Sequence, residues 1–169
     1  MNLLKKIFQK YSSKGISSEL LADAHFKTGN VHGLQGKWEM AVREYKAAIK
    51  CNTDSPEAHF NLANVYMQMK DWANAISEYK ETLRLSPKDV QAHINQGNAS
   101  GKLGRWEEGL SAFQEALKFE PNNGSAHYNA GYAFGRLGHN EEAIREWRIA
   151  ANLGHAEAKN ILGEIREQV

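Results

Sequence analysis

Apolar residues recur along this chain at intervals of three and four, the spacing of one helical face. Between residues 56 and 89 they form two runs, Phe60, Leu62, Ala63, Tyr66 and Met69, then Ala75, Ile76, Tyr79, Leu83 and Leu85. The runs are separated by Lys70-Asp71, where other parts of the chain have Gly36-Lys37, Gly104-Arg105 and Gly138-His139. Glycine readily adopts the left-handed conformation that ends a helix. The pattern therefore predicts a helix, a tight turn and a second, antiparallel helix.

This helical hairpin recurs every 34 residues. Small residues keep that spacing at Ala41, Ala75, Gly109 and Ala143, and aromatic residues keep it at Tyr45, Tyr79, Phe113 and Trp147 and again at Trp38, Trp72 and Trp106. A fixed period of this length is typical of stacked helical arrays, in which each unit buries its apolar face against its neighbours. We expect one domain that works through the shape of its surface.

The positions of these residues resemble the tetratricopeptide repeat (TPR) family. The second unit has His59, Leu62, Ala63, Tyr66, Ala75, Tyr79 and Pro87 at the family's motif positions, and the third has His93, Gln96, Gly97, Ser100, Gly109, Phe113 and Pro121. The fourth matches through His127, Ala130, Gly131, Phe134, Ala143 and Trp147, whereas the first has Thr53 where proline is usual. The resemblance implies an all-α fold, a right-handed α-solenoid of four helix-turn-helix hairpins with terminal capping helices.

The repeat region is expected to span residues 17–157, with units at about 22–55, 56–89, 90–123 and 124–157. Residues 156–169 place Ile161, Leu162 and Ile165 on one face, which predicts a C-terminal capping helix. Residues 1–16 form a basic amphipathic segment, whose apolar face comprises Leu3, Leu4, Ile7, Phe8 and Tyr11 and whose charges are Lys5, Lys6 and Lys10. Two interpretations stay open: a cap or frayed tail at the first repeat, or docking of residues 1–11 on a membrane surface or partner.

Composition narrows the possible partners. Of 169 residues, 41% are hydrophobic and 24% are charged, and the formal net charge is +1. This balance provides no general attraction to nucleic acid, so no nucleic-acid partner is predicted. Cys51 is the only cysteine, which excludes an internal disulfide, and we expect it to be buried as a small apolar residue. No apolar run reaches the roughly 18 residues of a membrane span, and no secretory cleavage site is evident. We expect a cytoplasmic protein, peripheral to a membrane if the first segment docks there.

The inner face of the array is the candidate binding site. Asparagines follow the repeat period in two rows, Asn61, Asn95 and Asn129, and Asn30, Asn64 and Asn98. A carboxamide both donates and accepts hydrogen bonds, which suits an extended peptide backbone. In the TPR family this face is the concave one that commonly receives peptides. The alternative is that these asparagines join neighbouring helices, and the sequence leaves both interpretations open.

Other residues should complete the surface. Apolar contacts are expected from Phe26, Phe60, Ile94, Tyr128 and Tyr132, with charges at the edges from Lys27, Lys102 and Arg136. Gly33, Gly101 and Gly135 either deepen the groove or accommodate a tight helix crossing. A partner with aromatic or aliphatic anchors and some acidic character would fit. The carboxylate clamp of some TPR domains is not expected, because Phe26, Gln91 and Asn95 stand where its basic side chains belong.

Catalysis and metal binding are not predicted. His25, His59, His93 and His127 form one column, but helices pack about 8–10 Å apart and zinc ligands lie about 2 Å from their metal. If these rings were buried and neutral, mild acidification would loosen the array. The sequence has no recognisable nucleophile and base, so we expect no enzyme activity. No cofactor is predicted. The predicted function is a monomeric, non-enzymatic module that binds an extended segment or helix of a protein partner; the alternative is a scaffold that self-associates through its repeats.

Overall fold

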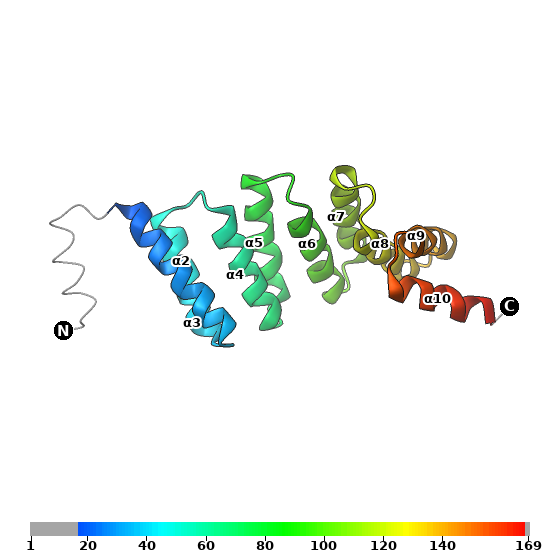
Figure 1. The fold of residues 1–169 in the computed structure, drawn as a ribbon, viewed down its shortest axis with the longest axis horizontal. Coiled ribbons are helices and arrows are strands. Elements are labelled where there is room, and N and C mark those ends of the chain that lie inside the picture. Colours follow the sequence, from blue (N-terminus) through cyan, green and yellow to red (C-terminus); the bar gives the residue numbers. More distant parts are fainter. Residues whose placement is uncertain (1–16, 168–169) are drawn as a thin grey trace.

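The computed structural model describes residues 17–167. Every regular element in this range is an α-helix, and Figure 1 shows the helices following one another in a row. The helices are α2 (Ser18–Leu34), α3 (Trp38–Cys51), α4 (Pro56–Gln68), α5 (Trp72–Leu85), α6 (Val90–Lys102), α7 (Trp106–Phe119), α8 (Gly124–Arg136), α9 (Asn140–Asn152) and α10 (Ala156–Glu167). The predicted all-α architecture is confirmed.

Consecutive helices pair into hairpins and the hairpins stack. Within a hairpin α2 packs on α3, α4 on α5, α6 on α7 and α8 on α9, and each second helix packs on the first helix of the next hairpin. The first helices also touch one another, α2 with α4 and α6 with α8. They therefore form one continuous side of the array. This is the arrangement of four hairpins that the 34-residue period predicted.

The turns within the hairpins explain the glycine pairs. Gly36, Gly104 and Gly138 have positive φ angles of 69°, 74° and 82°. At the corresponding place in the second hairpin, Lys70 adopts a φ of 60°. There the amide of Asp71 donates to the carbonyl of Tyr66 at 2.9 Å, which satisfies a carbonyl at the helix end. Lys70 thus occupies a position that glycine fills without strain.

Replacing Lys70 with glycine should stabilise the protein. The left-handed conformation costs a residue with a Cβ about 1–2 kcal/mol, whereas the extra freedom that glycine gives the unfolded chain costs about 0.5–1 kcal/mol. We expect Lys70→Gly to raise the free energy of unfolding by about 0.5–1 kcal/mol, measured by urea denaturation. The matched variant Gly104→Lys should lower it, and the same sign for both changes would contradict this account.

The small residues of the repeat allow helices to approach closely. Ala41, Ala75 and Ala143 are buried, as their packing role predicted. A Cβ on Gly97 would lie 2.5 Å from Cε1 of Phe113, so the phenyl ring occupies the space left by the missing side chain. Gly29 has the same relation to Tyr45, at 2.8 Å. Glycine on the first helix and an aromatic ring on the second are therefore complementary parts of one contact.

Three of the four histidines in the column lie beside a carboxylate of their own hairpin. Three histidines lie beside a glutamate on the second helix of the same hairpin, His25 with Glu44 at 2.7 Å, His59 with Glu78 at 2.6 Å and His127 with Glu146 at 2.6 Å. His93 instead contacts the carbonyl of Pro87 at 3.0 Å. Three of the four rings therefore have a carboxylate as their neighbour. The loosening of the array on acidification stays a prediction.

The two ends of the array differ. The predicted C-terminal capping segment forms α10, which packs on α9 and buries Ala158. Residues 1–16, for which a cap or a docking segment was predicted, lie outside the described range. Cys51 is partly exposed rather than buried, because it is the last residue of α3. Between residues 17 and 167 the helices all fall short of the length and apolar character needed to cross a membrane.

Candidate functional site

The asparagine rows join the first and second hairpins. The hydroxyl of Tyr45 donates to Oδ1 of Asn30 at 2.6 Å, and Nδ2 of Asn61 donates to the same oxygen at 3.1 Å. Tyr45 and Asn30 belong to one hairpin, whereas Asn61 belongs to the next. Burial raises the pKa of the Tyr45 phenol above its usual value. Hydrogen bonding with Asn61 acts in the opposite direction but is the smaller effect. The phenol therefore stays protonated and donates its hydrogen bond.

The same arrangement joins the second and third hairpins. The hydroxyl of Tyr79 donates to Oδ1 of Asn64 at 2.5 Å, and Nδ2 of Asn95 donates to that oxygen at 3.2 Å. Burial again raises the pKa of the tyrosine. Asn95 is held further by Gln91, whose Nε2 donates to its Oδ1 at 2.8 Å. For these four asparagines, the interpretation as links between helices describes the observed contacts.

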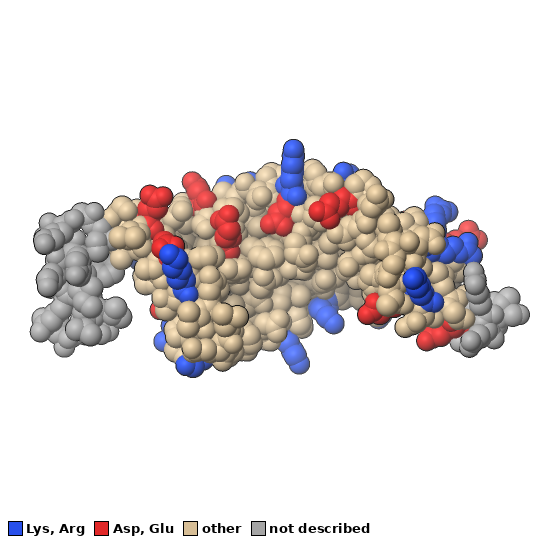
Figure 2. Space-filling view, viewed as in Figure 1, with Lys and Arg blue, Asp and Glu red and all other residues tan. Residues whose placement is uncertain are grey.

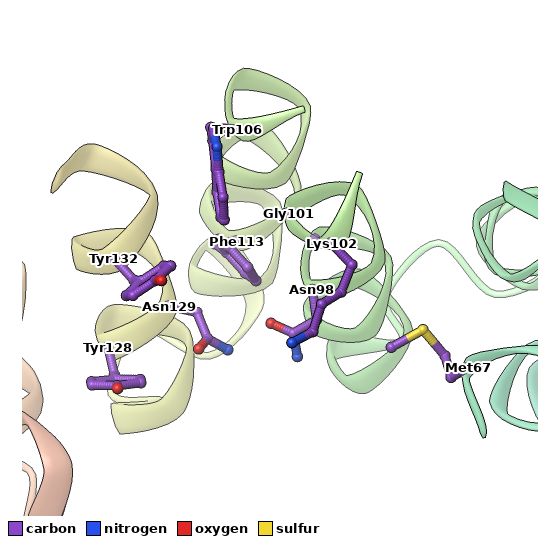
Figure 3. A pocket seen from close by; sticks show the side chains of 10 residues that line it. Met67, Asn98, Gly101, Lys102, Trp106, Phe113, Tyr128, Asn129 and Tyr132 are labelled. Atoms are coloured by element: carbon purple, nitrogen blue, oxygen red, sulfur yellow. The ribbon is translucent and has the colours of Figure 1, made fainter. Parts of the chain in front are cut away.

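The next pair differs because the tyrosine is replaced. Phe113 stands 34 residues after Tyr79 and has no hydroxyl to donate. Asn98 and Asn129 accordingly make no hydrogen bond with another side chain among residues 17–167. Figure 3 shows their carboxamides pointing toward each other from α6 and α8. Both line a hollow of about 450 Å³, so their donors and acceptors face open space.

Aromatic side chains form one wall of this hollow, which we call the α6–α8 hollow. Trp106, the first residue of α7, lies 5.6 Å from Tyr132 between ring centroids. The guanidinium of Arg136 lies 4.8 Å from the centroid of the Trp106 ring, within the range of a cation–π contact. Lys102 and Tyr128 also line the hollow, and Met67 reaches it from α4. The lining thus combines amide, aromatic and cationic groups.

A second hollow continues from the first. It measures about 430 Å³ and shares Asn98, Tyr128 and Asn129 with the α6–α8 hollow. Its other lining residues are Gln91, Ile94, Asn123, Ser125, His155 and Glu157. The ring of Tyr128 stacks on that of His155 at 4.4 Å, which anchors the shared wall to the segment before α10. The two hollows form a continuous trough along α6 and α8.

The other predicted site residues are less available. Phe26 and Phe60 pack against Tyr45 and Tyr79, with ring centroids 5.9 and 5.8 Å apart. Lys27 is exposed and pairs with Asp23 at 2.8 Å. Ile94 is only 4% exposed and belongs to the hydrophobic core, although its edge contributes to the trough. The hollows beside Phe26 measure about 250 and 260 Å³, smaller than those along α6 and α8.

The glycines that were predicted to deepen the groove or fit a tight crossing have different neighbours. A Cβ on Gly101 would lie 2.8 Å from Cζ3 of Trp106. At this position the glycine of α6 therefore accommodates an aromatic ring of α7, the second helix of the same hairpin. On Gly135 the nearest atom would be Cη2 of Trp147 at 3.6 Å, and on Gly33 it would be the Tyr45 hydroxyl at 3.9 Å, both ordinary contacts. Tight packing explains the glycine only at position 101.

Sequence reasoning did not select Trp106 and Met67 as site residues. Trp106 was recognised only as a member of the tryptophan column, and nothing in the sequence indicated that its ring would lie against Tyr132. Met67 comes from the preceding hairpin, so its place in the hollow depends on how the hairpins stack. The sequence feature that could have indicated this hollow is the change from tyrosine at positions 45 and 79 to Phe113 at the equivalent position of the third hairpin.

Charges lie mainly along the edges of the array. In Figure 2 acidic side chains lie along the upper edge with lysine or arginine side chains among them, and further lysine or arginine side chains project from the lower edge. Glu19 and Glu57 lie in the first turns of α2 and α4, whereas Lys102 and Arg136 lie in the last turns of α6 and α8. These placements complement the helix dipoles. They also put cations at the helix ends that border the trough.

Comparisons with known families match most of the repeat region. A family model described as TPR repeat matches residues 29–70 and 97–138, and one described as tetratricopeptide repeat matches residues 56–89. A search of curated proteins finds no match.

Solved structures share the fold. The crystal structure of MamA superposes with a TM-score of 0.78 at 19% identity, over 92% of this chain and 86% of MamA. The first TPR of Spaghetti (RPAP3), bound to the HSP90 peptide SRMEEVD, gives 0.68 at 26% identity, over 73% of this chain and 99% of that one. The Arabidopsis OM64 TPR domain gives 0.66 at 24% identity, over 70% and 98%. Stacked helical hairpins are therefore common to all these chains.

Proposed function

We propose, from the premise that this chain belongs to the tetratricopeptide repeat family, that it binds an extended peptide segment of a protein partner in the trough along α6 and α8. The family's fold is a protein-interaction module, and one chain of similar fold is described with a bound peptide. Since the array is formed before binding, the ordering cost falls mainly on the partner.

The proposal depends on Asn98 and Asn129. Their carboxamides face each other across the α6–α8 hollow and lack the tyrosine that holds the equivalent asparagines elsewhere. Two free carboxamides can each donate to a peptide carbonyl and accept from a peptide amide. A peptide backbone between them would find both kinds of partner. This supports recognition of the backbone at the third and fourth hairpins.

Side-chain preference follows from the walls of the hollow. Tyr132, beside Trp106, offers an apolar surface for an aromatic or aliphatic side chain of the partner. Lys102 and Arg136 favour acidic groups next to that anchor. The remaining part of the proposed surface extends along the first helices through Phe26, Lys27, Asn30, Phe60, Asn61, Asn64, Ile94 and Asn95. We do not propose SRMEEVD itself as a ligand, because the clamp's basic positions are not basic here.

Alanine at both positions 98 and 129 should weaken binding about 30-fold. We count one lost hydrogen bond for each asparagine, at about 1 kcal/mol each. The two together amount to about 2 kcal/mol, and 1.4 kcal/mol corresponds to tenfold in affinity. The probe is a fluorescent peptide recovered from a random phage-displayed library selected on the full chain, with affinity measured by anisotropy. Phe113→Tyr should also weaken binding. The new hydroxyl would donate to Oδ1 of Asn98, as the Tyr79 hydroxyl donates to Oδ1 of Asn64, and that oxygen would no longer be free for a peptide amide.

Asn160→Ala, an exposed change on α10, is the control and should leave affinity unaltered. Equal affinities for the wild type, the double alanine variant and Phe113→Tyr would refute the proposed role of Asn98 and Asn129. If selection recovers no peptide and light scattering shows a mass that rises with concentration, the self-associating scaffold is the better account.

A further inference from the structure

The first helix of the array has an uncovered face. Val31 is 50% exposed and Leu20 is 58% exposed, which is unusual for two large apolar side chains on one helix. Ala24 lies between them and is also exposed. These residues are separated by four and seven positions, so they share one side of α2. The side chains form a stripe that no residue between 17 and 167 covers.

Two positions of this stripe, those of Ala24 and Val31, are buried in every later hairpin, whereas the equivalents of Leu20 are the exposed polar residues Asp54, Lys88 and Asn122. At the place of Val31, the equivalents 34, 68 and 102 residues on are Val65 at 5% exposure, Ala99 at 0% and Ala133 at 0%. At the place of Ala24 they are Ala58, Ala92 and Ala126, all buried. In each case the second helix of the preceding hairpin packs there, α3 on α4, α5 on α6 and α7 on α8. The part of the stripe formed by Ala24 and Val31 is therefore an inter-hairpin packing face, and Leu20 extends it toward the start of α2.

The chain itself supplies a matching segment. Residues 1–16 precede Ser17, the N-cap of α2. Their sequence spacing would place Leu3, Leu4, Ile7, Phe8 and Tyr11 on one face of a helix. Between α3 and α4 the chain reverses direction within residues 52–55. Residues 12–16, which follow the apolar face, are enough for a reversal of that length. The segment thus stands in the sequence where a preceding second helix would stand.

Charge also favours this occupant. In a helix, Lys5, Lys6 and Lys10 would lie off the apolar face of the segment. The start of α2 carries the exposed carboxylate of Glu19 and that of Asp23, which also pairs with Lys27 at 2.8 Å. Figure 2 shows acidic side chains over this end of the array. A basic segment folded back on α2 would place opposite charges beside the apolar contact.

We infer that residues 1–16 pack their apolar face against the Leu20, Ala24 and Val31 stripe of α2 and complete the array as its N-terminal cap. The segment takes the place that α3, α5 and α7 occupy against the first helices that follow them, so it protects the packing face and removes a surface that could bind another copy. This role is independent of the trough along α6 and α8.

Hydrogen exchange of the full chain tests the cap. The variant Ile7→Gln/Phe8→Gln removes apolar contact, and the control Asn2→Ala/Gln9→Ala changes the opposite side of the segment. We expect amides of residues 18–34 to exchange at least fivefold faster in the apolar variant, with a lower melting temperature, and to be unchanged in the control. Because the change lies outside the described helices, α4 to α10 should keep their protection.

Three outcomes would overturn the inference. The first is unchanged exchange of α2 in the apolar variant. The second is a mass that rises with concentration in light scattering for the wild type only, which would make a second copy the occupant. The third is protection of α2 that appears only when phosphatidylserine-containing vesicles are present, which would make a membrane surface the occupant.

Discussion

Replacing Tyr79 with alanine is expected to lower the free energy of unfolding by about 4 kcal/mol, since truncation of a buried aromatic side chain typically costs about 3–5 kcal/mol. Tyr79 is 0% exposed and is the largest fully buried side chain among residues 17–167. Its ring packs in the core that joins the first three hairpins, and its hydroxyl holds Asn64. The change would therefore leave a cavity and remove a link between hairpins. Urea denaturation monitored by circular dichroism measures the loss.

Tyr79→Phe separates the two contributions. It keeps the ring and removes only the hydroxyl, so we expect a loss of about 1 kcal/mol. It would also reproduce, at Asn64, the situation that Phe113 creates at Asn98. A loss of less than about 1 kcal/mol for Tyr79→Ala would mean that the ring does not hold the hairpins together as described.

Replacing Gly97 with valine should be the second largest change, a loss of about 3 kcal/mol, at the upper end of the usual cost of overpacking. A Cβ at this position would lie 2.5, 2.8 and 2.9 Å from three atoms of the Phe113 ring, closer than atoms can pack. The ring is only 4% exposed and packs between α6 and α7, so a shift large enough to admit valine would disturb that contact. The helices would have to separate. Denaturation in urea and the protection of α6 and α7 amides report the effect.

Gly33→Ala is the matched control, since it also adds a Cβ to a glycine of a first helix. Here the nearest atom would be the Tyr45 hydroxyl at 3.9 Å, an ordinary contact. Alanine favours helix over glycine by up to about 1 kcal/mol, so this variant should be neutral or more stable. If both glycine substitutions destabilise the protein equally, close approach of the ring is not the reason for Gly97.

The third hairpin is the least regular, and the trough lies beside it. It has Phe113 where the first two hairpins have tyrosine, and Ala112 where the other three have the glutamate that pairs with histidine. The first change removes the tyrosine–asparagine link of the first two hairpins, and the second removes the histidine–glutamate pair of the other three. The first change leaves Asn98 and Asn129 without a side-chain hydrogen bond in the described part of the chain. Departure from the repeat pattern, rather than the pattern itself, is thus what distinguishes the proposed site.

Part of the candidate site was predictable. The period placed Asn30, Asn64 and Asn98 in one row and Asn61, Asn95 and Asn129 in the next, and the structure places members of the two rows side by side. The sequence left open whether they bind a ligand or each other. That choice depends on whether a tyrosine hydroxyl on the second helix reaches the oxygen of an asparagine fifteen residues earlier. Such a contact follows from the helix crossing, which composition and spacing do not specify.

The amino-acid sequence by itself determined the helices, their turns and their order of stacking, because a 34-residue period of small and aromatic residues leaves each hairpin only its neighbours to bury its apolar side. It also identified the rows of asparagines. Only the tertiary structure decided which of these asparagines hydrogen-bond to a neighbouring helix, and where Trp106 and Met67 lie. Side-chain contacts between hairpins depend on ångström-scale distances and ring orientations, which arise when whole helices pack together.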